Sequence, residues 1–287
     1  MLGWNFGVPQ HVVNGPRFNP NDGDEIIFMD RPYGSQFEFR LWRYRISSIS
    51  MEQVLAGSNL VNTHFSADWG SNDWILLNLR SAGGAENIFT VKSNGDSLTQ
   101  LTFTSMNFSP LWSPSCSAYG YQRSAAPGGT VRVDVATGYH DTVPGFFDQS
   151  TCWYSDSHAA TVTPYGVFHW DMTTDQTDQV CGLPADLYDF STPSGLAVLP
   201  GHHTAVWTHA GGLFSTDMGT GATTQMLRTC NSRYFVGLDY SPQTNKLVTT
   251  RITRTPLNDH DLLIDTDIVL MNPDGTGQQV LEIPFPE

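Results

Sequence analysis

Short runs of apolar and β-branched residues alternate with polar turns along the whole chain, and no segment sustains the 3.6-residue period of an amphipathic helix. Apolar strands are expected at 25–28, 74–77, 118–121, 159–162, 205–207 and 247–250. A tight turn rich in Gly and Asn closes a later hairpin at 93–96 and returns at 136–139, 219–222 and 272–277. Gly and Asn supply the positive φ that such hairpins require, so the pattern predicts many short antiparallel strands.

A second recurring element sets the register of this repeat. An aromatic residue followed by Ser and Pro, or by a variant of that pair, precedes each apolar strand, most clearly at 112–114 and 240–242. The residues aligned just before the aromatic position are Arg17, His64, Leu111, Trp153, Ala197 and Asp239, in steps of 47, 47, 42, 44 and 42 residues. This period, with several short strands in each unit, is typical of a β-propeller.

The chain is therefore predicted to be all-β, a single six-bladed β-propeller domain over 1–287 with four antiparallel strands per blade. The expected blades cover about 15–57, 62–104, 108–143, 150–182, 194–228 and 235–283. No Pro/Ser-rich linker or shift in composition divides the chain, which agrees with one domain. The extended segment at 4–13 is expected to add a strand to the last blade and close the ring.

The repeat resembles that of the TolB-like (WD40-like, PD40) six-bladed propeller family. The segments 65–102 and 235–281 match best, and the resemblance extends over about 15–281. The chain departs from the family pattern where Asp should follow Ser-Pro, since Ser115 and Gln243 stand there. The resemblance implies the propeller fold and no single activity, because this scaffold hosts lyases, peptidase caps, lectins, cyclases and interaction modules.

Charge narrows the choice of partners. The formal net charge is −14, and Lys92 and Lys246 are the only lysines in the sequence. Such a surface repels nucleic acid and anionic membranes, so neither is expected as a partner. A polysaccharide lyase, the third hypothesis, is disfavoured for the same reason, because a polyuronate needs basic residues to neutralise its carboxylates. No run of about 18 apolar residues exists that could span a membrane.

Cysteine usage favours an oxidising compartment, so a secreted or secretory-pathway protein is expected although the chain carries no signal peptide. Cys116–Cys152 and Cys181–Cys230 are predicted disulfides, since each pair lies on adjacent blades. Four buried thiols are the alternative. Asn107 begins an Asn-Phe-Ser glycosylation sequon, which indicates a glycoprotein if the sequon lies on a loop.

Neither a finished catalytic motif nor a cofactor motif is present, so no cofactor or metal site is assigned. The acidic loop at 258–267 is interpreted as solvated, with calcium binding as the alternative. Arg17, His64 and Asp239 are the candidate catalytic residues, because a cation, an imidazole and a carboxylate around the propeller axis could polarise a carbonyl and move a proton. An inter-blade salt bridge with a satisfied histidine is the competing interpretation.

Aromatic residues of the loops that join each outer strand to the next inner strand, together with Trp153, are predicted to wall a pocket at the channel mouth. These candidates are Phe108, Phe147, Trp153, Tyr188, Tyr234 and Phe235. The predicted ligand is a neutral, largely apolar or aromatic small molecule, and a cofactor-free cyclase or condensing enzyme of Diels–Alder or strictosidine-synthase-like chemistry is the favoured function, by analogy of fold. The alternative is a non-catalytic TolB-like propeller that binds a protein or a glycan.

Overall fold

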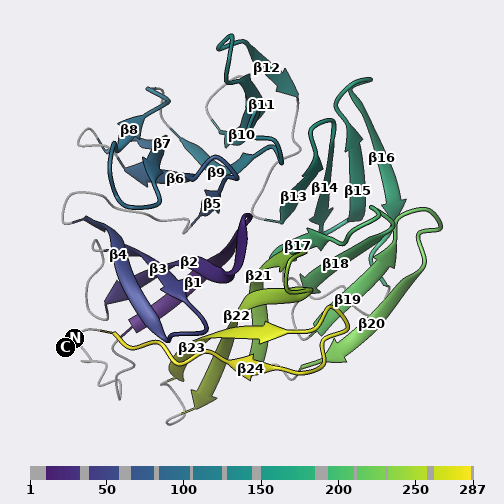
Figure 1. Ribbon diagram of the computed structural model, residues 1–287. Helices are drawn as coiled ribbons and strands as arrows, with labels where there is room; N and C mark the ends of the chain where they lie inside the picture. The colour runs from purple at the N-terminus through teal and green to yellow at the C-terminus, as the bar shows by residue number, and fades with distance from the viewer. Residues whose placement is uncertain are drawn as a thin grey trace, which may run out of the picture.

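The computed structural model describes residues 11–32, 39–57, 66–80, 84–103, 106–124, 128–143, 150–184, 193–209, 212–229, 232–256 and 262–285. Within these ranges every regular element is a β-strand. Six four-stranded antiparallel sheets are arranged around a central axis (Figure 1). The predicted all-β class and the six blades of four antiparallel strands are confirmed.

Each blade is a simple meander in which consecutive strands are neighbours in the sheet. Blade one contains β1 (His11–Asn19), β2 (Asp22–Pro32), β3 (Phe39–Arg45) and β4 (Ser50–Gly57). Blade two contains β5 (Ala67–Trp69), β6 (Trp74–Arg80), β7 (Glu86–Lys92) and β8 (Thr99–Gln100). Blade three contains β9 (Asn107–Trp112), β10 (Ala118–Arg123), β11 (Gly129–Asp134) and β12 (His140–Val143).

The other half of the ring repeats the same order of strands. Blade four contains β13 (Thr151–Ser155), β14 (His158–Thr163), β15 (Gly166–Asp171) and β16 (Gln176–Cys181). Blade five contains β17 (Gly195–Val198), β18 (Thr204–His209), β19 (Gly212–Asp217) and β20 (Thr223–Arg228). Blade six contains β21 (Arg233–Ser241), β22 (Lys246–Pro256), β23 (Leu262–Met271) and β24 (Gln279–Val280).

The first strand of each blade is the innermost, and inner strands such as β1, β5 and β21 contact one another around the axis. Because each meander alternates direction, all six inner strands begin at the same end of the ring. We call this end the mouth face, and the other the turn face. The turns between first and second strands and between third and fourth strands lie at the turn face.

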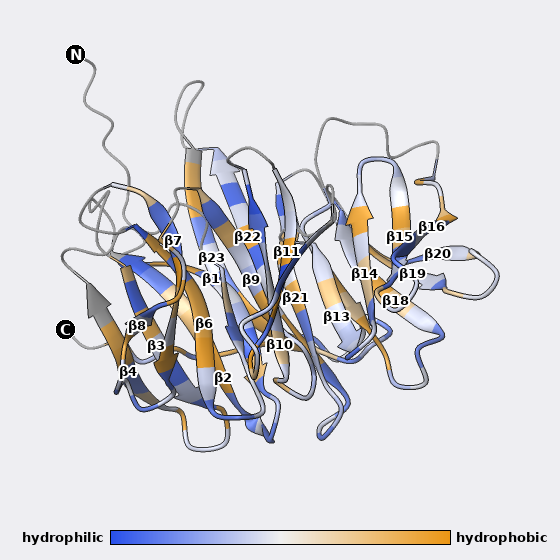
Figure 2. Cartoon of the chain, turned by 90° about the horizontal axis from the view of Figure 1, so that it is seen from above, coloured by the Kyte–Doolittle hydropathy of each residue, from blue (hydrophilic) through white to orange (hydrophobic). Residues whose placement is uncertain are grey.

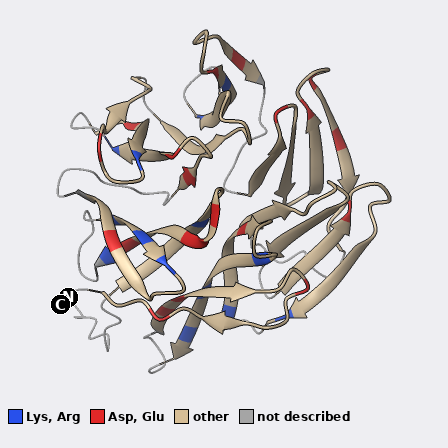
Figure 3. Cartoon of the chain, in the orientation of Figure 1, with Lys and Arg blue, Asp and Glu red and all other residues tan. Residues whose placement is uncertain are grey.

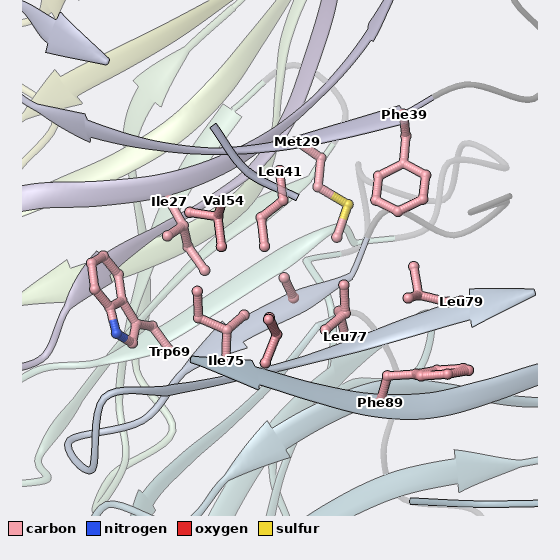
Figure 4. Packing of buried hydrophobic residues seen from close by; sticks show 12 residues of the cluster. Ile27, Met29, Phe39, Leu41, Val54, Trp69, Ile75, Leu77, Leu79 and Phe89 are labelled. Carbon is pink, nitrogen blue, oxygen red and sulfur yellow. The ribbon is translucent and has the colours of Figure 1, made fainter. Parts of the chain in front are cut away.

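Apolar side chains pack between neighbouring sheets, as alternating strands require. Figure 4 shows this packing between blades one and two, where Ile27 and Leu41 meet Ile75 and Leu77. All four of these side chains are fully buried. Hydrophobic positions run along strands such as β6, as Figure 2 shows. The repeat of this interface around the ring builds the core and fixes the position of the channel.

The ring closes without a shared strand among the described residues, because β1–β4 form blade one and β21–β24 form blade six. The expected extra strand of the last blade is wrong for 11–13, which belong to β1, while 4–10 lie outside the described residues. The segment after β24 makes the closure instead. Phe285 stacks on His11 with ring centroids 3.8 Å apart, and the Tyr44 hydroxyl donates a 3.0 Å hydrogen bond to the Glu282 carbonyl.

Phe285→Ala is expected to lower the free energy of unfolding by about 1–2 kcal/mol, because it removes an aromatic side chain that packs half-buried against blade one. Urea unfolding followed by tryptophan fluorescence measures the change. Phe103→Ala is the matched control, since Phe103 is 80 % exposed and should cost about 0.5 kcal/mol or less. Equal losses in the two variants would show that the C-terminal segment does not stabilise the ring closure.

The predicted Cys116–Cys152 disulfide is wrong, because both residues are free cysteines. Two cysteines on adjacent blades cannot form a disulfide when their side chains face different neighbouring blades. The Cys116 Sγ lies 3.3 Å from the Ser71 Oγ of blade two, whereas the Cys152 thiol accepts a hydrogen bond from the Val198 backbone of blade five. Cys181 is also a free cysteine, and its predicted partner Cys230 lies outside the described residues.

The structure does not support Asn107 as a glycosylation site, because its side chain is fully buried. Asn107 begins β9 rather than lying on a loop, and its amide donates hydrogen bonds to Thr102 Oγ1 at 3.2 Å and Asn87 Oδ1 at 3.4 Å. A glycan attached to this nitrogen would have to break both contacts and open the space between blades two and three.

Candidate functional site

Six equivalent residues, one on the inner strand of each blade, form a ring around the channel. Strand register identifies them, because each pairs with the equivalent position of its second strand, as Arg17 does with Ile27 and Asp239 with Val248. We call them the inner ring. Its members are Arg17, Asp68, Leu111, Cys152, Ala197 and Asp239.

Two of the six predicted inner positions are wrong. In blade two the position belongs to Asp68, and His64 lies outside the described residues. In blade four it belongs to Cys152, because a register shift between Trp153 and Ser155 displaces the aromatic-Ser pattern by one residue. Trp153 is only 7 % exposed and packs in the core of blades three and four.

Three inner-ring side chains each tie their own blade to the following one. Asp239 Oδ2 accepts a 2.7 Å hydrogen bond from the backbone N–H of Phe18, across the closure between blades six and one. Asp68 Oδ2 accepts the same kind of bond, also 2.7 Å, from Trp112 in blade three. The Cys152 thiol accepts one from Val198 in blade five. The repeated geometry shows that these groups serve the ring structure.

Arg17 is the cation of the inner ring and lies between two carboxylates. Its Nη1 donates a 2.7 Å hydrogen bond to the carbonyl of Leu238, and its Nε is 3.9 Å from Asp68 Oδ1. Its charge also reaches Asp239, where it opposes the rise that burial causes in the pKa of that carboxyl. The structure therefore brings together two of the three predicted catalytic residues, Arg17 and Asp239, and adds Asp68.

Burial is the main cause of the shifted pKa values of the inner-ring carboxyls and thiol. Desolvation raises the pKa of Asp68 to about 6, although Arg17 and the Trp112 N–H oppose the shift. Desolvation likewise raises the pKa of Asp239 against the same arginine. It raises the pKa of the Cys152 thiol to about 12, so this sulfur is a protonated thiol at neutral pH and not a nucleophile.

A pocket of about 190 Å³ opens at the mouth face beside Arg17. It lies between the inner strands of four blades and is lined by Asn14, Gly15, Pro16, Arg17, Ser66, Ala67, Ser194, Val236, Gly237 and Ile252. We call it the mouth pocket. Gly15 (φ 62°) and Gly237 (φ 66°) adopt left-handed conformations at matching register shifts in β1 and β21. A Cβ atom at Gly237 would meet no atom within 4 Å, so open space lies beside this backbone.

The predicted aromatic wall is not built at this pocket by the described residues. Phe235 is 1 % exposed and lies in the core between blades five and six. Tyr234 packs under Arg254, whose guanidinium carbon is 4.8 Å from the ring centroid, and Phe108 is half-buried on β9. Neither these residues nor Trp153 line the mouth pocket. Phe147 and Tyr188 lie outside the described residues.

One feature of the sequence does point to Asp68 as an inner-ring residue. Asp68-Trp69 repeats the Asp-aromatic pair of Asp239-Tyr240, and both pairs precede a turn and an apolar strand. Trp69 is followed by Gly and Ser rather than Ser and Pro, which hides the correspondence.

No group of three or more His, Cys, Asp or Glu in the described ranges is placed to hold a metal ion, and 258–261 of the acidic loop lie outside those ranges. Charged residues are scattered over the blades in Figure 3 and form no continuous basic face in that view. The described part of the chain contains no helix long and apolar enough to cross a membrane.

No protein family and no curated protein matches the sequence. Solved structures do: a puromycin-hydrolysing peptidase of Mycobacterium tuberculosis is similar over 98 % of this chain and 55 % of its own, at 11 % identity and a TM-score of 0.58. The chain shares a propeller fold with it. The AtxE2 isopeptidase is similar over 97 % of this chain and 53 % of its own, at 8 % identity and a TM-score of 0.52. TolB of Acinetobacter baumannii is similar over 94 % and 54 %, at 11 % identity and a TM-score of 0.43.

The chain thus spans about half the length of these three proteins. Identities this low establish the fold alone. The six-bladed architecture that the TolB-like resemblance implied is confirmed, and the activities of the larger proteins are not transferred.

Proposed function

We propose that this propeller binds a small, neutral molecule in the mouth pocket and does not transform it. The mouth pocket itself carries the proposal, because it is a preformed recess at the channel end with Arg17 beside open backbone. Pockets that hold drug-sized ligands are usually about 300–1,000 Å³. A volume of about 190 Å³ suits a smaller molecule or the end of a longer one.

The lining supports a ligand with an apolar body and one polar end. Pro16, Val236 and Ile252 offer apolar surface, whereas Ser66 and Ser194 offer hydroxyl groups. Asp68 and Asp239 together carry more negative charge than Arg17 carries positive charge. An anionic ligand would therefore gain little electrostatic attraction in the mouth pocket. A carbonyl or hydroxyl oxygen could accept a hydrogen bond from the guanidinium without an added charge.

Binding without turnover is the better-supported interpretation of the inner ring. Its carboxylates and its thiol are already engaged in hydrogen bonds between blades. A general base must reach its substrate proton at hydrogen-bond distance, and a nucleophile needs an activated form. Catalysis of a cyclisation or a condensation would therefore have to come from the orientation of the bound substrate alone.

Gly237→Asn is expected to weaken binding of neutral fragments at least tenfold. Asn tolerates the left-handed backbone of this position, and its side chain would occupy the open space beside it. Binding of a library of neutral fragments is followed by two-dimensional ¹H–¹⁵N NMR, with shifts expected for the amides of Gly15, Ala67 and Gly237.

Gly138→Asn is the matched control. Gly138 also has a left-handed φ, 67°, and a Cβ atom there would meet no atom within 4 Å, but it lies in the turn between β11 and β12 at the turn face. This variant should bind as the parent does. The proposal fails if no fragment shifts the three mouth amides, or if the two Asn variants bind equally well.

A further inference from the structure

A second recess lies between blades four and five, at the turn face and therefore at the far end of the ring from the mouth pocket. Its volume is about 450 Å³. Blade four contributes Tyr154 from β13, His169 from β15, and Asp178 and Gln179 from β16. Blade five contributes His202 and Thr220 from two turns. We call it the histidine groove.

Aromatic rings form one wall of the groove. The Tyr154 ring lies 5.0 Å from His202 and 6.2 Å from His169, measured between centroids. His158 stacks on His169 at 5.2 Å with 12° between the planes, which fixes the His169 ring. The result is a partly exposed aromatic surface shared by two blades, in which the Tyr154 ring is tilted by 33° to His169 and by 37° to His202.

The imidazole at the centre of this wall is neutral at neutral pH. Desolvation, followed by the neighbouring His158, lowers the pKa of His169. A neutral ring presents an apolar face, whereas an imidazolium would hold water and repel its stacked neighbour.

Polar groups border the rings. Tyr154 lines the groove, and its hydroxyl group can both donate and accept a hydrogen bond. Asp178, Gln179 and Thr220 are exposed along the groove. Gln179 Nε2 donates a 2.8 Å hydrogen bond to the Tyr165 carbonyl, which holds the amide in place and leaves its oxygen free to accept.

This combination excludes several ligand classes. The imidazoles stack face to face rather than converging, and the described residues contain no group of three metal-ligating side chains. Asp178 in the groove and the net charge of −14 disfavour anions. The exposed polar rim disfavours a wholly apolar ligand, which needs most of its surface buried.

We propose that the histidine groove binds a neutral saccharide. The C–H face of a sugar ring would pack on Tyr154, His169 and His202, while its hydroxyl groups would bond Asp178, Gln179 and the Tyr154 hydroxyl. A sugar can leave its remaining hydroxyl groups in water, which fits an open groove. This site does not depend on the mouth pocket, since the two lie at opposite ends of the propeller.

Binding of cellohexaose, maltohexaose and chitohexaose to the whole chain at pH 7 is followed by ¹H–¹³C NMR of the histidine and tyrosine rings and by ¹H–¹⁵N NMR of the mouth amides. At least one of these oligosaccharides is expected to shift the ring signals of Tyr154, His169 and His202. His202→Asn should weaken its binding at least tenfold, because Asn keeps the left-handed turn of His202 (φ 59°) and removes the ring. Tyr154→Phe should weaken it severalfold through loss of the hydroxyl.

His140→Asn is the control, since His140 is an exposed residue of β12 in blade three. It should bind as the parent does. Failure of all three oligosaccharides to shift the groove rings would overturn the proposal, as would equal binding by the His202 and His140 variants. Shifts of the mouth amides alone would place saccharide binding at the mouth pocket and also overturn it.

Discussion

Replacing Arg17 with methionine is expected to lower the free energy of unfolding by about 3–5 kcal/mol at pH 7. The substitution keeps an extended side chain but leaves Asp68 and Asp239 without their shared cation. Two partly buried carboxylates, with the Asp68 side chain 19 % exposed, would then repel each other across the channel. Because protonation relieves this repulsion, the loss should be clearly smaller at pH 5 than at pH 7.

Chemical unfolding of the variant and the parent at both pH values measures this loss. Arg254→Met is the control, because Arg254 is an exposed arginine of β22 that packs on Tyr234 and should cost about 1 kcal/mol or less. The double variant Arg17→Met/Asp68→Asn should recover part of the loss, which shows that the two side chains interact. A loss that is the same at both pH values would contradict the charge arrangement of the inner ring.

Asp68→Asn alone is expected to remove a pH dependence of stability. Desolvation raises the pKa of Asp68 from 3.8 to about 6 in the folded chain. A carboxyl whose folded pKa is raised favours folding when protonated, so its contribution is lost as pH rises from about 4 through about 6. Relative to Asp68→Asn, the parent should therefore lose about 2.4 kcal/mol of stability between pH 4 and pH 7.

Asn at this position can still accept the hydrogen bond from the Trp112 N–H through its carbonyl oxygen. Comparison with the parent cancels the opposite contributions of carboxyls whose pKa is lowered, such as Asp134 and Asp217. Asp141→Asn, an exposed substitution on β12, serves as the control and should leave the pH profile parallel to that of the parent. A parallel profile for Asp68→Asn would mean that this carboxyl titrates normally.

The sequence is sufficient to predict the fold because period and alternation are set by strand geometry. The aromatic-Ser-Pro turns at 112–114 and 240–242 place Leu111 and Asp239 correctly on the inner ring. Blade two replaces Ser-Pro with Gly-Ser after Trp69, so the pattern assigns its inner position four residues too early, to His64 instead of Asp68.

The candidate site is harder to predict because single-residue shifts change which face a side chain occupies. The irregularity between Val236 and Asp239 breaks the alternation, so the inward Asp239 gives no guide to Phe235, which faces the core. The shift after Trp153 likewise makes Trp153 a core residue and Cys152 the channel residue. Neither irregularity has a distinctive residue pattern beyond Gly237.

The sequence also does not reveal which carboxyl groups have shifted pKa values. Composition reveals many acidic residues, but not which of them burial isolates. Asp68 and Asp239 have raised pKa values because the channel desolvates them, whereas Asp274 in a turn has a lowered pKa because Thr276 donates hydrogen bonds to it. These opposite outcomes depend on neighbours that come from other strands or from turn geometry.

We expect this propeller to meet its ligand in the mouth pocket beside Arg17, and not at the inner-ring carboxylates Asp68 and Asp239. A crystal structure of the chain soaked with the tightest-binding neutral fragment tests this expectation most directly. We expect the fragment between the inner strands of blades one and six, beside Gly237, with an oxygen at hydrogen-bond distance from Arg17 and the ties of Asp68 and Asp239 unbroken. A fragment found elsewhere on the chain, or one that displaces these ties to reach the carboxylates, would contradict the account.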